Sequence, residues 1–290
     1  MQAVRLASTK DMSHGEWLLW RQKGIGGSDA AAICRMSRYK SPMGVYLDKL
    51  GELPPIEDNP KMKAGRMLEP IIADWFSEET GYKVQRRNAI LSHPKHSFML
   101  ANIDRWLSGQ NAGLECKNTA EYCKEDWSGT QAPTEYILQC NHYMAVTGAD
   151  RWYIAVLIGG WDFQWRVIER DDDLIRNLIT VEKEFWHDHV LAKVPPAYSH
   201  QDTEFLKTQF PTSTPNAAFQ LGEDTYPIMQ DLFRARADEE DAKRRKNSAA
   251  NQIKGLMGEN ELAFFQGDLK FTWKTNKKGI RTFNVIGGDE

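Results

Sequence analysis

Apolar residues recur along the first two thirds of the chain at the spacings of helices and strands. Between positions 61 and 80 they return every three or four residues, which predicts a helix with one buried face. Pro70 falls inside this pattern and lacks a backbone donor, so we expect the helix either to kink there or to begin near it. Gly81 is the residue type that commonly ends a helix.

Strand patterns dominate the next hundred residues. Short apolar or alternating runs predict strands over 82–85, 89–91, 98–106, 113–117, 151–158 and 163–168. The turn residues 108–111 favour a hairpin between the third and fourth of these strands. Helical patterns lie at 134–146 and 171–191, and we expect the second of these helices to close the core.

The two ends of the chain follow other patterns. Residues 13–50 predict a loop and two helices, and Ser28 or Asp29 before an alanine run is a natural N-cap. Towards the C-terminus, a long charged helix over 224–257 precedes a β-hairpin pair over 262–286. The predicted organisation is therefore a domain at 1–198, a linker at 199–222 and an extension at 223–290.

Composition adds only broad limits. Hydrophobic residues make up 41% of the 290 positions and charged residues 27%, as in ordinary soluble globular proteins. The sequence has neither a signal-peptide run nor a membrane-spanning apolar stretch, which favours the cytoplasm and no membrane association. Four scattered cysteines without a C-x-x-C pair disfavour a disulfide framework or an iron–sulfur cluster. The net charge of -3 disfavours a protein that coats nucleic acid, but not an enzyme with one basic cleft.

Candidate chemistry lies on the predicted hairpin. Asp104 belongs to one strand, and Glu115 and Lys117 lie on the next, where alternation places both side chains on one face and Cys116 on the other. Two converging carboxylates form a site for a hard cation such as Mg²⁺. A neighbouring lysine can orient a water or stabilise charge that develops on phosphorus. Taken alone, such a short match is more often a set of solvated residues on an exposed strand.

Two further polar positions lie on predicted helix faces. Glu69 shares a helix row with Ile72 and Phe76, at the edge of a buried face where a carboxylate needs a partner or a metal. Gln139 and Tyr143 are four residues apart and therefore share one face of their helix. An ordinary polar helix position is the simpler interpretation of Gln139 when it is taken alone.

Together these residues form an ordered set of motifs. The set comprises G-x-x-x-E at 65–69, D…E-x-K at Asp104, Glu115 and Lys117, and Q-x-x-x-Y at 139–143. It resembles the lambda-exonuclease and RecB-like branch of the PD-(D/E)xK nucleases. Within that branch, the segment 26–33 and the later Ser41-Pro42 pair are similar to the YqaJ-type phage recombination exonucleases. The resemblance covers residues 17–195 and departs from the PD motif at Ile103.

The resemblance implies a fold and an activity. The fold is α/β (α+β): a restriction-endonuclease-like core with a central mixed sheet flanked by helices, and a C-terminal helix plus β-hairpin extension. The activity is a Mg²⁺-dependent 5′-to-3′ exonuclease, with Mn²⁺ as a substitute, that degrades one strand of linear duplex DNA. The implied partners are double-stranded DNA ends, a single-strand annealing recombinase of the phage type and further copies of the same chain.

Individual roles also follow from the resemblance. The implied metal ligands are the side chains of Glu69, Asp104 and Glu115 and the carbonyl of Cys116. The implied catalytic set is Asp104, Glu115, Lys117 and Gln139, supported by Tyr143. An arginine seven residues before the serine of the glycine-rich segment binds the 5′ phosphate in the family, and Arg21 and Ser28 have that spacing. Arg21 offers a forked donor, and the glycines before Ser28 leave backbone N–H groups at a helix start.

Alternatives remain open at this point. A structure-specific or restriction-type endonuclease can use the same fold, although the segment 26–33 favours the exonuclease branch. A DNA-binding or annealing protein without catalytic activity is expected to have lost one of Asp104, Glu115 or Lys117, and none is lost. In the C-terminal region, basic and aromatic residues alternate over 269–286, which suits either a nucleic-acid surface or a hairpin packed on the long helix.

Overall fold

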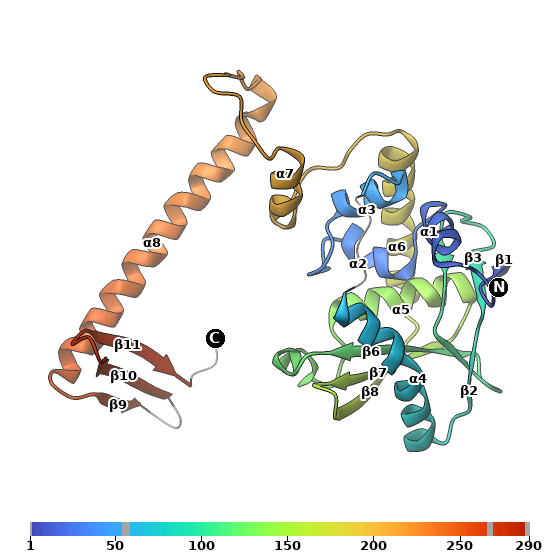
Figure 1. Cartoon of the computed structure of the whole chain (residues 1–290), viewed down its shortest axis with the longest axis horizontal. Coiled ribbons are helices and arrows are strands. Elements are labelled where there is room, and N and C mark those ends of the chain that lie inside the picture. Colours follow the sequence, from blue (N-terminus) through green and yellow to red (C-terminus); the bar gives the residue numbers. More distant parts are fainter. Residues whose placement is uncertain (1, 54–58, 266–268, 288–290) are drawn as a thin grey trace. The chain divides into compact units, whose positions relative to one another are not determined.

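A computed structural model describes residues 2–53, 59–265 and 269–287 (Figure 1). The chain forms two compact units, one up to Thr212 and the other from Ser213 onward. The division falls inside the 199–222 segment that the sequence marks as a linker.

The first unit contains the helices and strands that build the core. Its helices are α1 (His14–Gln22), α2 (Gly27–Ile33), α3 (Pro42–Leu50), α4 (Pro60–Thr80), α5 (Thr134–Thr147), α6 (Asp172–Glu184) and α7 (Thr203–Gln209). Its strands are β1 (Val4–Ser8), β2 (Val84–Arg86), β3 (Ala89–Ser92), β4 (Leu100–Ala101), β5 (Arg105–Leu107), β6 (Ala112–Thr119), β7 (Arg151–Ile158) and β8 (Asp162–Glu169). The helix pattern of α6 continues as a π-helical segment, Phe185–Leu191.

The central sheet is mixed, as expected. Its five strands have the order β2-β5-β6-β7-β8, in which β6 and β7 are parallel and the other pairs are antiparallel. Helix α4 and helix α5 flank the sheet (Figure 1). A separate small antiparallel sheet joins β1, β3 and β4. The predicted fold class, a central mixed sheet flanked by helices, is confirmed.

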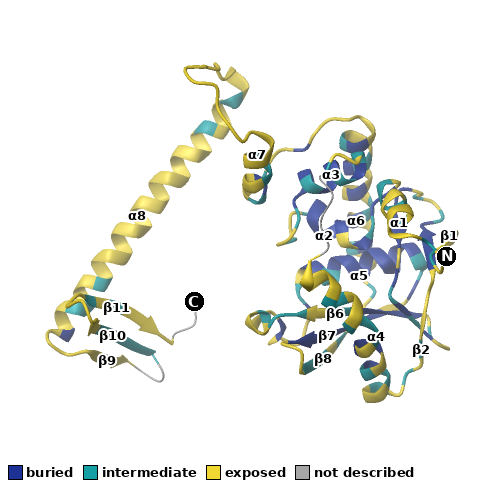
Figure 2. Cartoon of the chain, viewed as in Figure 1, coloured by how far each residue is buried: buried dark blue, intermediate teal, exposed yellow. Residues whose placement is uncertain are grey.

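Strand β7 is buried on both faces, which explains its uninterrupted apolar sequence. Trp152, Ile154 and Val156 contribute to the core cluster on the α5 side. Tyr153 and Ala155, which alternate with them, pack with the buried residues of α4. Figure 2 shows the resulting band of buried residues through the middle of the first unit. The central sheet therefore separates two apolar clusters.

The predicted strand over 98–106 is wrong as a single element. Leu100 and Ala101 belong to the small sheet, whereas the central sheet begins again at Arg105. The reason is a backbone contact with a distant segment: Leu100 N–H donates to the Ile25 carbonyl at 2.7 Å, and Ile25 N–H donates to the Phe98 carbonyl at the same distance. Asp104 consequently lies in the bend that leads into β5.

Two helix predictions also need correction. Helix α4 begins at Pro60, after the Asn59 N-cap, and continues through Pro70 to Thr80. Asn59 accepts from the Met62 N–H at 3.0 Å, so a good N-terminal cap and a long buried face offset the missing donor of the internal proline.

Residues 13–50 contain three helices, because a capping box between Ser13 and Glu16 begins an additional helix, α1. The N-cap of α2 is Gly26, whereas the sequence suggested Ser28 or Asp29. Asp29 is the third helical residue, and its carboxylate accepts from the Gly26 N–H at 3.1 Å. The acid therefore caps the helix from inside its first turn.

The second unit combines a long helix with a small sheet. Helix α8 (Tyr226–Met257) precedes β9 (Leu262–Phe265), β10 (Leu269–Thr275) and β11 (Arg281–Ile286), which form an antiparallel sheet with β10 in the centre. Helix α8 is exposed along most of its length (Figure 2). The guanidinium of Arg281 lies 3.5 Å from the ring centroid of Trp273, and Lys254 of α8 lies over Phe283. In the part of the chain that the structure describes, no helix is both long and apolar enough to cross a membrane.

A buried ion pair connects α5 to α6 in the first unit. His142 Nδ1 lies 2.8 Å from Glu182 Oε1, and His142 Nε2 lies 2.9 Å from the Leu100 carbonyl. Both neighbours are acceptors, so the ring is satisfied when both nitrogens carry protons. Burial alone would lower the pKa of His142, but Glu182 and the carbonyl raise it above its ordinary value. His142 of α5, as an imidazolium, therefore binds helix α6 through Glu182 and strand β4 through the Leu100 carbonyl.

Replacement of this imidazolium should destabilise the first unit strongly. In His142→Leu the Glu182 carboxylate stays buried without its partner, so we expect the free energy of unfolding to fall by about 3–5 kcal/mol. Urea unfolding followed by circular dichroism measures this loss. His142→Leu combined with Glu182→Leu should recover part of it, because the unpaired charge is gone. A double variant less stable than the single variant would contradict the ion pair.

The same experiment has a pH dependence with a definite sign. Because the pKa of His142 is raised in the folded chain, the ion pair contributes fully below about pH 6.5, where the unfolded histidine is also protonated. Its contribution declines as the pH rises through the folded pKa. The stability difference between the wild-type chain and His142→Leu should therefore shrink on the alkaline side.

Candidate functional site

The predicted catalytic residues meet on the α5 side of the central sheet. Glu115 and Lys117 project from β6 towards α5, while Leu114 and Cys116 pack with the cluster on the α4 side. Asp104 lies opposite this part of β6, because the hairpin pairs Arg105 with Leu114. The alternation of strand β6 thus brings together the acids and the lysine that the sequence marks.

Glu115 is the centre of the hydrogen-bond network. Its Oε1 accepts from Lys117 Nζ at 2.7 Å and from Gln139 Nε2 at 2.6 Å. The same Gln139 nitrogen lies 2.9 Å from the Tyr143 hydroxyl. Glu115 Oε2 is buried and has no hydrogen-bond partner among the described residues. A buried carboxylate oxygen without a partner is costly, so this atom is a candidate ligand atom for a cation.

Asp104 adds a second carboxylate in the same environment. Burial raises its pKa well above the ordinary value, and repulsion from Glu115 and Glu69 adds to that shift. The Cys116 N–H donates to Asp104 Oδ2 at 2.9 Å. In an extended strand the N–H and the C=O of one residue face the same edge, so the Cys116 carbonyl faces the Asp104 side as well.

Glu69 has a different position from the other two acids. It lies on α4, and its Oε1 accepts from Arg105 Nη1 at 2.5 Å. Arg105 is the first residue of β5 and shares a strand face with Leu107, which packs on the α4 side, so this arginine draws the Glu69 carboxylate towards itself. Over the described residues, no group of three or more His, Cys, Asp or Glu side chains is arranged to hold a metal ion.

The remaining donors nevertheless fit a hard divalent cation. Two carboxylates and one backbone carbonyl supply oxygen atoms, which Mg²⁺ prefers and which leave room for water and a phosphate. The unpartnered Oε2 of Glu115 supplies a free ligand atom. A bound cation would also relieve the repulsion between Asp104 and Glu115.

Lys117 carries the positive charge of the site. Burial alone would lower its pKa, but the neighbouring Glu115 carboxylate raises that pKa well above the ordinary value. Its Nζ also lies 5.0 Å from the ring centroid of Tyr136, within range of a cation–π contact. Lys117 is therefore protonated at neutral pH and acts as a fixed cation.

A cavity of about 180 Å³ opens beside Asp104. Its lining includes Arg21 and Ser28, together with Tyr143 and the indole rings of Trp17 and Trp20. The structure thus places both residues of the predicted 5′-phosphate site in one cavity with a predicted catalytic acid.

The expectation of free N–H groups before Ser28 is wrong for Gly26, whose N–H donates to Asp29. Close packing accounts for two glycines of this segment. A Cβ at Gly24 would lie 2.4 Å from the Phe98 carbonyl oxygen, and a Cβ at Gly27 would lie 2.4 Å from the Tyr143 ring. The segment therefore needs these glycines for contact with β4 and α5 as much as for any ligand.

The sequence analysis missed a charged cluster behind this cavity. Asp29 is fully buried and is contacted by Lys49 at 2.6 Å and by Arg21 and Lys40 at 3.4 Å each. Burial alone would raise the pKa of Asp29, but these three cations hold it well below its ordinary value. Asp48 is the second acid of the cluster, so the cluster keeps one surplus positive charge.

Some of the missed residues left a signal in the sequence. Lys49 shares a helix row with buried Val45, so a lysine falls on an apolar face, which is typical of a residue with a buried partner. His142 likewise lies in a helix whose neighbouring residues are buried. The pairing of Arg105 with Glu69 left no such signal, because it depends on how β5 faces α4.

The family described as a YqaJ-like viral recombinase domain matches residues 16–150. A protein of Bacillus subtilis (strain 168), described as uncharacterized protein YqaJ, is 39% identical over 278 residues, which are 94% of this chain and 87% of that protein.

The first unit also has counterparts among solved structures. The crystal structure of an alkaline exonuclease, LHK-Exo, from Laribacter hongkongensis aligns with a TM-score of 0.52 and 22% identity over 67% of this chain and 97% of that one. The structure of the same exonuclease in complex with dAMP aligns with a TM-score of 0.51 over the same shares of the two chains. At this identity the comparison shows a shared fold.

The close approach of Gly27 to Tyr143 can be tested directly. Gly27→Ala places a methyl group against the ring, so we expect the free energy of unfolding to fall by about 1–3 kcal/mol. Urea unfolding measures it. Gly15→Ala is the matched control, because nothing lies within 4 Å of its Cβ and alanine favours the helix. Equal stabilities for the two variants would contradict the prediction, because they would show that the Tyr143 ring moves aside without a cost in free energy.

Proposed function

The chain belongs to the YqaJ-like viral recombinase family, and on that basis we propose that it is a divalent-metal-dependent exonuclease that degrades one strand of linear duplex DNA from its 5′ end. The remaining 3′ single strand would serve an annealing recombinase of the phage type. The fold shared with an alkaline exonuclease supports this proposal. The observation that carries it is the unpartnered Oε2 of Glu115, a carboxylate that binds Lys117 through its other oxygen and repels Asp104.

The metal would be held by this chain's own oxygen atoms. We assign it to the carboxylates of Asp104 and Glu115 and to the Cys116 carbonyl, with Mg²⁺ as the expected ion and Mn²⁺ as a substitute. When bound, a divalent cation polarises the phosphate and lowers the pKa of water. Glu69 is engaged by Arg105, so we assign it an indirect part: its charge raises the pKa of Asp104.

The protein groups around the cation have separate tasks. Lys117 stays protonated and provides positive charge beside the phosphate on which negative charge develops. Gln139 donates to Glu115 and so fixes the rotation of the carboxylate, which leaves Oε2 free. Tyr143 lies within hydrogen-bond distance of the Gln139 amide and holds it in place. We therefore propose Gln139 and Tyr143 as positioning residues.

The cavity beside Asp104 is proposed as the site of the 5′ phosphate. Arg21 lines it and belongs to the cluster with one surplus positive charge, so a phosphate can share its guanidinium with the two acids of that cluster. The Ser28 hydroxyl supplies a neutral donor in the same cavity. A site for the terminal phosphate next to the catalytic acids would restrict cleavage to the end of a strand.

Removal of either proposed carboxylate should abolish cleavage. Asp104→Asn or Glu115→Gln should lower the rate at which a linear duplex with a 5′ phosphate is degraded by at least two decades, about 2.7 kcal/mol. A gel assay with 3′-labelled duplex and Mg²⁺ measures the rate. Glu78→Gln, which changes an exposed acid on α4, is the matched control and should cleave normally. Full activity of the wild-type chain in excess EDTA would overturn the metal-dependent mechanism.

The polarity of digestion gives a second test. A duplex with 5′ phosphates should be degraded faster than one with 5′ hydroxyl groups, and Arg21→Gln should remove most of that difference. Arg176→Gln, on the exposed face of α6, is the control. Circular dichroism of Arg21→Gln shows whether the Asp29 cluster still folds. Equal rates on the two wild-type substrates, or fragments from closed circular DNA, would favour the endonuclease alternative.

A further inference from the structure

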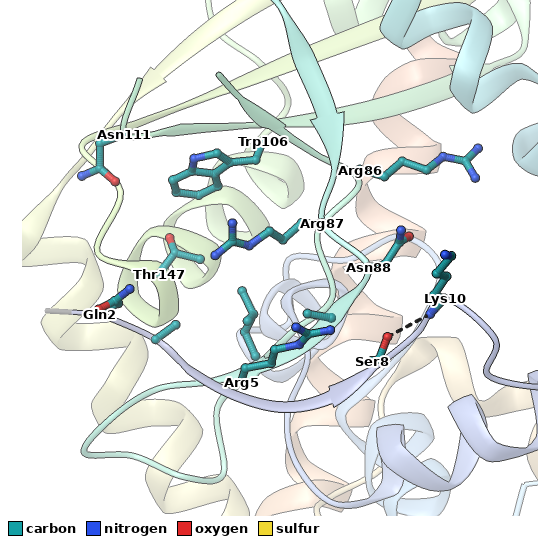
Figure 3. A pocket seen from close by; sticks show the side chains of 13 residues that line it. Gln2, Arg5, Ser8, Lys10, Arg86, Arg87, Asn88, Trp106, Asn111 and Thr147 are labelled. Carbon is teal, nitrogen blue, oxygen red and sulfur yellow. Dashed lines mark hydrogen bonds between the residues drawn. The ribbon is translucent and has the colours of Figure 1, made fainter. Parts of the chain in front are cut away.

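A second concave surface lies on the other side of the small sheet. This cavity of about 630 Å³ is formed by β1 and the residues after it, by the end of β2 and by the central sheet. Figure 3 shows its polar lining side chains. We call it the basic groove and define it by Arg5, Lys10, Arg86, Arg87, Asn88 and Trp106.

The charge of the basic groove is one-sided. Its lining includes three arginines and one lysine, and none of its described lining residues is acidic. None of these four cations forms an ion pair with a carboxylate in the described part of the chain. A chain with a net charge of -3 has therefore concentrated uncompensated positive charge in one concave place. Such a concentration attracts a polyanion.

The groove is separated from the proposed 5′-phosphate cavity by a single strand. Ala89 and Leu91 of β3 line the groove, whereas Ile90 between them lines the cavity beside Asp104. Trp106, in the groove, follows Asp104 by two residues, so their Cα atoms are at most about 7 Å apart. The two places are therefore close enough for one extended ligand to contact both.

The chemistry of the lining selects the kind of ligand. Arginine guanidinium groups bind phosphate oxygens through paired donors, and Asn88 adds an amide beside them. Figure 3 shows Arg87 extended towards the Trp106 ring, and the guanidinium lies 5.9 Å from the ring centroid. Trp106 packs edge-on with Trp152 and is only half-buried, so the residue is partly accessible from the groove. Phosphates and flat rings occur together in a nucleic-acid strand.

We propose that the basic groove binds a single-stranded segment of the DNA on which the nuclease acts. Within a duplex the base faces are stacked on one another, whereas a single strand leaves them free to stack on an aromatic ring, which favours a single strand over a duplex. The inference rests on the proposed function for the identity of the nucleic acid. It goes further because it places a second contact with the DNA outside the catalytic site, on residues that the family motifs do not include.

The salt dependence of binding tests the groove without any cleavage. Binding of a fluorescent oligo-dT strand to the full chain is measured by anisotropy in EDTA over a series of NaCl concentrations. Each lost phosphate contact reduces the slope of log K against log salt by about 0.7 for a single strand. Arg86→Gln combined with Arg87→Gln should therefore flatten the slope by about 1.4. Lys183→Gln combined with Lys193→Gln removes two exposed cations that line neither cavity and should leave the slope unchanged.

Each outcome bears on the groove separately from the nuclease. An unchanged slope in the Arg86 and Arg87 variant, or a wild-type chain that does not bind the strand, overturns the groove. A slope change of about 1.8 with duplex DNA, the value for two lost contacts on a double strand, overturns its assignment to a single strand. Cleavage of labelled duplex with Mg²⁺ by the same proteins reports on the proposed function. If the chain cuts DNA but the slope does not change in the variant, the proposed nuclease activity is supported and the proposed DNA-binding groove is contradicted.

Discussion

Strand β7 must be buried on both faces, and most of the first unit follows from that constraint. Its parallel partner β6 is fixed in register along its whole length, with Glu115 opposite Ile154. This register decides which side chains of β6 enter the apolar cluster on the α4 side and which face α5. A shift by one residue would send Glu115 and Lys117 into the apolar cluster, where neither charge would have a partner. The same pairing that stabilises the sheet therefore sets the geometry of the candidate site.

Charge is distributed around that site in a consistent way. Two acids with mutual repulsion lie at the end of the β5–β6 hairpin, a protonated lysine lies beside them, and a cluster with surplus positive charge lies behind the adjoining cavity. The unfavourable part of the arrangement is local: two carboxylates and one unpartnered oxygen. Proteins commonly retain such local cost at functional sites, where a ligand supplies the missing contact.

The sequence was informative where structure is local. The period of two over 113–117 predicted which residues of β6 share a face. The spacing of Gln139 and Tyr143 predicted a shared helix face, and the two side chains lie 2.9 Å apart. It was uninformative where a distant segment decides. The run over 98–106 is divided because Ile25 bonds to Leu100. The position of Glu69 on α4 is likewise set by Arg105, a residue of strand β5, and no local pattern encodes that choice.

The ion pair of His142 has a consequence for the small sheet, whose strand β3 lies between the two cavities. The Leu100 carbonyl that accepts from this ring belongs to β4, the edge of the sheet whose middle strand β3 separates the cavities. The small sheet is thus attached to α5 and α6 through a fully buried contact, although its other edge strand, β1, is exposed. Local opening of the small sheet is therefore expected to begin at the exposed edge strand β1 rather than at β4, which the buried His142 contact holds.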